Sequence, residues 1–159
     1  MPGLLMENDH FEMGLAPVAD FAAADTETDV VNMNLHDTVR FIVVWGVGTT
    51  GVIKFTVDAC DDVVPTNTAK IPFWYRITAA GGTPGTVTLA DKDTGVSNTA
   101  GSDQIIEIEV RHNALAASGY NYVRLVHDET TDDPILGGTL IQMGNPRFAG
   151  TVSSGSAVT

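Results

Sequence analysis

The chain has 159 residues, enough for one domain with its own core, and 43% of them are apolar, an ordinary share for a globular protein. Eight basic residues against twenty acidic ones give a formal net charge of −12, and a surface of that sign repels phosphate backbones and anionic membranes, so we expect neither nucleic acid nor membrane as a partner. The single cysteine, Cys60, excludes an intramolecular disulfide, and we expect no signal peptide and no membrane span.

Residues 1–34 differ in composition from the rest of the chain. They hold seven acidic residues and no Lys or Arg, and their apolar residues follow no sustained period. We expect an extended acidic arm that is either solvated or ordered by contact with a neighbouring subunit. Its candidate contact residues are Leu4, Leu5, Phe11 and Phe21.

Strand patterns begin after the arm, and we expect residues 35–149 to form the folded domain. The run 39–45 is apolar on both faces, which predicts a central strand, and the alternation over 52–59 predicts another. Between them, residues 45–51 read "WGVGTTG" and contain G-x-G-x-x-G, the pattern of a dinucleotide-binding turn. That turn requires a helix after its third glycine. Because a strand follows here, we interpret the glycines as the connection of a β-hairpin.

The segment 71–78, "IPFWYRIT", predicts a strand with two different faces. Phe73 and Tyr75 share one face, and Trp74 and Arg76 share the other. An exposed Trp beside an Arg is typical of a contact hot spot, whereas a buried Trp would belong to the core, and both interpretations of Trp74 stay open.

Further strands are predicted at 85–91, 104–110, 120–127 and 138–144. Seven short strands separated by turn signals predict an all-β fold, a single sandwich of about seven to eight strands that is either immunoglobulin-like or a jelly roll. The alternation after Tyr120 directs Val123 and Leu125 inward rather than Arg124. Residues 111–119 predict one helical turn, and residues 150–159, small and polar, predict a flexible tail.

No motif in the chain carries catalytic chemistry, so we expect neither an enzyme nor a cofactor. The histidines lack the spacing of a zinc site and have no adjacent nucleophile motif, and we interpret His36 and His127 as surface residues. We expect Cys60 to be buried and structural. Acid clusters that offer oxygen ligands lie at 58–62, 91–95 and 127–134. The cluster at 91–95 lacks the Glu that closes a calcium loop, so we favour solvated loops without a metal.

Five segments together resemble a group of small tailed-bacteriophage virion proteins. They are "FIVVWGVGTTG", "ACDDVVPTNTAKIPFWYR", "AGSDQIIEIEV", "ALAASGYNYVRL" and "NPRF", within residues 41–148. The resemblance is to head decoration, or cement, proteins. It implies a structural protein of the virion surface, assembled in the host cytoplasm, that binds the major capsid protein, forms a homotrimer and stabilises the contacts between capsomers.

Under this resemblance, Trp74, Arg76 and the N-terminal arm are the hypothetical contact elements. Two alternatives remain at this point. One is a carbohydrate-binding sandwich on a phage surface, and the other is a head-completion or tail structural protein.

Overall fold

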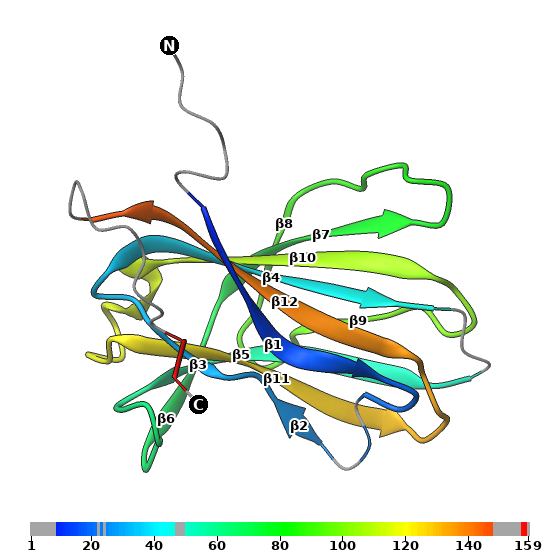
Figure 1. The fold of residues 1–159 in the computed structure, drawn as a ribbon, viewed down its shortest axis with the longest axis horizontal. Coiled ribbons are helices and arrows are strands. Elements are labelled where there is room, and N and C mark those ends of the chain that lie inside the picture. The colour runs from blue at the N-terminus through cyan, green and yellow to red at the C-terminus, as the bar shows by residue number, and fades with distance from the viewer. Residues whose placement is uncertain (1–8, 22, 24, 47–49, 148–156, 159) are drawn as a thin grey trace.

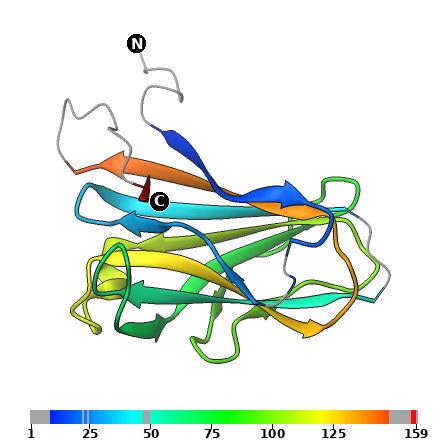
Figure 2. The same cartoon turned by 60° about the horizontal axis from the view of Figure 1, so that its bottom comes forward.

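The computed structural model describes residues 9–21, 23, 25–46, 50–147 and 157–158. They form an all-β sandwich in which two antiparallel sheets pack face to face (Figures 1 and 2). The one helical segment among them is the 3-10 turn η1 (His112–Leu115), inside the predicted helical turn, and Gly119 follows it at φ 73°. None of these segments is a helix long and apolar enough to cross a membrane.

Sheet A has the strand order β1–β12–β4–β10–β7–β8. Its strands are β1 (His10–Val18), β12 (Gly137–Pro146), β4 (His36–Trp45), β10 (Gln104–Arg111), β7 (Phe73–Ala79) and β8 (Thr88–Ala90). Sheet B has the order β13–β3–β11–β5–β6, with β2 also paired to β11 and β9 to β5. Its strands are β13 (Ala157–Val158), β3 (Val30–Asn32), β11 (Tyr122–Thr131), β5 (Val52–Cys60), β6 (Thr68–Ile71), β2 (Thr26–Glu27) and β9 (Val96–Ser97).

The principal strand pairs are nested along the sequence. β1 pairs with β12, β3 with β11, β4 with β10, and β5 with β6. Nesting of this kind arises when one long antiparallel hairpin is rolled into two sheets, which is the jelly-roll arrangement. Of the two architectures that the strand pattern left open, the strand order therefore matches the jelly roll.

The predicted hairpin across residues 45–51 was wrong. β4 lies in sheet A between β12 and β10, whereas β5 lies in sheet B, so the two strands do not pair with each other. Residues 47–49 lie outside the described part. Gly51 is required by its surroundings, because a Cβ there would lie 2.5 Å from the Asp133 carbonyl oxygen. Local alternation located both strands, but their pairing partners come from distant parts of the chain.

The core lies between the inner faces of the two sheets. The inward positions predicted by alternation are confirmed, since Phe73, Ile106, Ile108, Val123 and Leu125 are all buried. The largest fully buried side chains come from strands of both sheets and from the segments that join them. They are Phe21, Phe41, Phe55, Phe73, Met33, Ile53, Ile106, Ile108, Leu115, Leu125, Ile141 and Met143.

The N-terminal segment is part of the sandwich as far as the structure describes it, which corrects the predicted arm boundary at residue 34. β1 forms one edge of sheet A, and β2 and β3 belong to sheet B. Phe21 is only 1% exposed and lies edge-on to the His127 ring, so its assignment as a partner contact was wrong. Register shifts on either side of Leu15 interrupt β1, which explains why no sustained period is visible there. Leu4 and Leu5 lie outside the described residues.

The predicted flexible C-terminal tail also needs correction at two positions. Ala157 and Val158 form β13, opposite Val31 and Val30 of β3. Residues 148–156 and 159 lie outside the described part of the chain.

Candidate interaction surface

The outward-pointing side chains of sheet A form a surface that we call the outer face of sheet A. Eleven large apolar side chains are exposed among the described residues, and ten of them lie on the strands of sheet A or one residue beyond. The exception is Val64, in the connection between β5 and β6. Exposed apolar area is therefore concentrated on one sheet, as in proteins that bind another surface there.

The outer face of sheet B is polar by comparison. Lys54 contacts Asp128 at 2.7 Å, and Arg124 contacts both Glu27 and Asp58. The charged side chains of this face thus pair with one another, and the two faces of the sandwich differ in what they offer to a partner.

Part of the outer face of sheet A is apolar, where β1, β12, β4 and β10 carry Met13, Leu140, Ile42, Val44 and Ile105. Register places Met13 opposite Leu140, Leu140 opposite Ile42, and Val44 opposite Ile105. A shallow depression of about 470 Å³ is lined by Met13, Val44 and Leu140 together with neighbouring residues. We call this region the apolar half.

The apolar half includes the outward side chains Ile42 and Val44 of the run 39–45. That run, apolar on both faces, predicted a central strand, and β4 is indeed flanked by β12 and β10. Its inward side chains, Phe41 and Val43, are fully buried, whereas Val44 on the outer face is 44% exposed. A strand that is apolar on both faces normally has both faces covered. Within the described residues, the second face of β4 has no cover.

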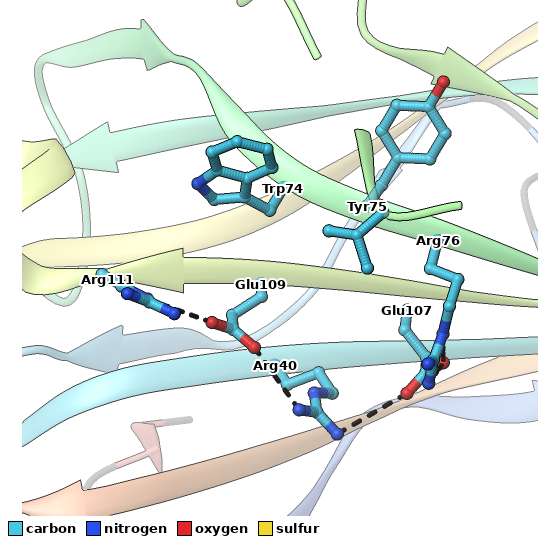
Figure 3. Close-up of a pocket in the computed structure, with 8 residues that line it drawn as sticks. Arg40, Trp74, Tyr75, Arg76, Glu107, Glu109 and Arg111 are labelled. Atoms are coloured by element: carbon cyan, nitrogen blue, oxygen red, sulfur yellow. Dashed lines mark hydrogen bonds and ion pairs between the residues drawn. The ribbon is translucent and has the colours of Figure 1, made fainter. Parts of the chain in front are cut away.

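Charged side chains follow one another across the centre of the same face. Arg76 of β7 contacts Glu107 of β10, with Nε donating to Oε2 at 2.6 Å. Arg40 of β4 lies between the two glutamates, 3.5 Å from Glu107 and 3.4 Å from Glu109. Arg111 donates from Nε to Glu109 at 3.2 Å. Figure 3 shows this series, which we call the arginine–glutamate ladder.

A groove of about 430 Å³ lies between the ladder and the Trp74 side of the sheet. Trp74 is 44% exposed and points outward from β7, which favours the exposed interpretation of this residue over the core one. Register places it between Glu109 of β10 and Leu89 of β8, and Val87 also lines the groove. The groove thus combines an aromatic and aliphatic wall with a charged wall.

The structure brings together some of the predicted contact residues and separates others. Trp74 and Arg76 line the same groove, as their shared strand face indicated. Phe11, 53% exposed, lies on β1 at the opposite edge of sheet A, so it shares the face but not the groove. Phe21 is in the core, as described above.

Local patterns in the sequence did not predict the rest of the ladder, namely Arg40, Glu107, Glu109 and Arg111. Alternation over 104–110 does place the two glutamates on the outer face. Pairing them with Arg40 and Arg76 requires knowing that β10 lies between β4 and β7, and no local pattern contains that order.

Two groups with strongly shifted pKa values are buried and lie away from this face. Burial raises the pKa of the Cys60 thiol to about 12, and this residue is buried as predicted. His127 was predicted at the surface but is fully buried. Its Nε2 lies 3.0 Å from the Thr139 hydroxyl, and burial lowers its pKa to about 4. His36 is buried as well. All three side chains are buried, and none of them lines the groove or the depression described above.

In two of the acidic loops, carboxylates accept hydrogen bonds from residues of the same loop. Asp61 accepts hydrogen bonds from Thr66 and Asn67, chiefly the Asn67 side chain, which lower its pKa to about 2. Asp91 accepts the backbone N–H groups of Asp93 and Thr94. Within the described ranges, no group of three or more His, Cys, Asp or Glu side chains is arranged to hold a metal ion.

Comparisons with protein-family models, with curated proteins and with solved structures gave no significant match.

Proposed function

We propose that this chain is a structural virion protein that docks the outer face of sheet A on the outside of a phage capsid and stabilises the contacts between capsomers. The observation that carries the proposal is the uncovered apolar face of β4, with Val44 beside Ile105. Covering it with a partner would complete the two-sided burial that the composition of this strand indicates.

The energetics of such an interface suit a protein that acts by covering a surface. Burial of apolar area contributes roughly 25 cal/mol per Å², and a stable interface covers about 800 Å² on each partner. Exposed Trp and Arg residues, such as Trp74 and Arg76, are the types that dominate binding energies. When copies repeat around a symmetric shell, many modest contacts together stabilise the shell strongly.

The choice of a capsid as partner rests on the resemblance of residues 41–148 to phage head decoration proteins. The jelly-roll fold agrees with this choice without deciding it, because that fold occurs in viral shell proteins and in lectins alike. A homotrimer and the major capsid protein as direct partner belong to the same proposal.

The proposal is tested by sedimenting the purified chain with shells assembled from the major capsid protein of the same phage. Val44→Glu places a charge in the apolar half, and Val64→Glu makes the same change at an exposed site outside sheet A. We expect Val44→Glu to weaken binding at least about tenfold, or 1.4 kcal/mol, and Val64→Glu to leave it unchanged.

Both variants must first give the circular dichroism spectrum and melting behaviour of the parent chain. Failure of the parent chain to bind shells, or equal binding by both variants, would reject docking through the apolar half. Immunogold labelling of whole particles separates a position on the shell from a head-completion or tail position.

A carbohydrate-binding role is a second candidate, favoured by the groove itself. An exposed Trp74 beside arginine and glutamate side chains offers a stacking surface with hydrogen-bonding groups next to it. A glycan array distinguishes the two functions. Saccharide binding that Trp74→Ala abolishes, in a chain that does not bind shells, would support this candidate and reject the capsid proposal.

A further inference from the structure

The groove beside Trp74 differs in charge from the molecule as a whole. Three of the chain's eight basic residues line it, and two acidic residues accompany them. They are Arg40, Arg76, Arg111, Glu107 and Glu109. The groove therefore has a formal charge of +1, three minus two, within a chain of −12.

Several of the other basic side chains are neutralised where they stand. Lys54 contacts Asp128, Lys92 contacts Asp93, and Arg124 lies between Glu27 and Asp58. A partner rich in carboxylates would thus meet repulsion from most of this molecule. At the groove it would meet a local excess of arginine.

The order of charges in the ladder leaves arginines at both ends. Each glutamate contacts two arginines, and Arg111 at the β10 end is 62% exposed. Its Nε donates to Glu109, and within the described ranges its two terminal nitrogens make no hydrogen bond. A guanidinium group with free parallel N–H donors is suited to a carboxylate, which it binds through two hydrogen bonds.

An apolar wall faces this donor end. Trp74 lies directly across from Glu109 on the neighbouring strand, and Leu89 follows it on β8. Both side chains are exposed. The groove therefore fits a segment in which an acidic side chain stands next to an apolar one. It does not suit nucleic acid, whose repeated phosphates would meet the net charge of −12.

We propose that the groove receives an Asp or Glu side chain of the partner protein, whose carboxylate pairs with Arg111 while an adjacent apolar side chain packs on Trp74. The inference rests on the proposed docking function and specifies its chemistry. The face of the shell that meets β10, β7 and β8 is accordingly acidic.

Zero-length cross-linking tests the contact directly. Arg111→Lys keeps the charge and provides an amine, which a water-soluble carbodiimide joins to a touching carboxylate as an amide, with loss of one water to the reagent. On shells carrying this variant, we expect mass spectrometry to find position 111 joined to an Asp or Glu of the capsid protein. Cross-links confined to Lys54, Lys70 and Lys92 would overturn the inference.

A charge reversal provides the second measurement. We expect Arg111→Glu to bind shells at least about tenfold more weakly than the parent chain. Lys92→Glu makes the same change of charge at a loop position outside the groove, and we expect binding within about twofold of the parent. Equal binding by the two variants would overturn the contact at Arg111 while leaving shell docking intact. Absence of binding by the parent chain would instead reject the docking function itself.

Discussion

Replacing Phe21 by Ala tests whether the N-terminal segment is a folded part of the sandwich or a solvated arm. Phe21 is 1% exposed, lies 5.7 Å from the His127 ring between centroids, and its ring fills the space next to Gly137. Its backbone N–H also donates to the Ile135 carbonyl oxygen at 3.2 Å. Truncation to Ala removes core packing and leaves a cavity where the segment joins the sandwich.

Phe→Ala substitutions in cores cost about 3–5 kcal/mol. For a chain of this size, each kcal/mol shifts the melting temperature by about 2–4 °C, so Phe21→Ala should lower it by roughly 6–20 °C. The matched control is Phe11→Ala on β1, which is 53% exposed and should change the stability by no more than about 0.5 kcal/mol.

Differential scanning calorimetry of the parent chain and the two variants measures the effect. If residues 10–34 were a solvated arm, both variants would melt with the parent. A Phe21→Ala variant with unchanged melting would therefore refute the burial of this segment, and with it β1, β2 and β3 as parts of the sandwich.

Two further predictions concern the buried titratable groups. The pKa of His127 is about 4 in the folded chain and about 6.5 in the unfolded chain, so the unfolded state binds a proton first as the pH falls. The free energy of unfolding therefore decreases between about pH 6.5 and about pH 4, by roughly 3 kcal/mol in total. Urea unfolding at pH 7 and pH 4.5 should show a smaller loss in His127→Gln than in the parent chain, and equal losses would contradict the burial of a neutral imidazole. Cys60 is fully buried with a thiol pKa of about 12, so a thiol reagent at pH 8 should label it only after unfolding. Rapid labelling of the native chain would show that the strand end around Cys60 is open.

Local patterns in the sequence were enough to locate most strands and their faces. The alternation of Phe73, Trp74 and Arg76 gave the correct inner and outer sides of β7, and that of Val123, Arg124 and Leu125 did so for β11. These predictions hold because side-chain direction along a strand depends only on the period of two.

Strand partners could not be predicted in the same way. The hairpin assigned across residues 45–51 assumed that neighbouring strands in sequence pair with each other. In a nested jelly roll, β4 instead pairs with β10 and β12, and the ladder of Arg40, Glu107 and Arg76 exists only because of that order.

The predictions for the N-terminal segment and for the histidines were wrong for other reasons. Shifts of register around Leu15 conceal the strand period of β1, so composition alone suggested an arm. His127 continues the inward alternation of Val123 and Leu125, and that pattern outweighs the general tendency of histidine to lie at the surface. The outer face of sheet A required both kinds of information, because it combines residues from six strands.

The most direct test of the central claim is hydroxyl-radical footprinting of the chain, free and bound to phage shells. The outer face of sheet A carries three reactive side chains, Phe11, Met13 and Trp74, and Tyr122 on sheet B serves as the reference. We predict strong protection of Trp74 and Met13 on shells, with the oxidation of Tyr122 unchanged. Equal oxidation of Trp74 and Met13 in the free and bound chain would contradict docking through this face.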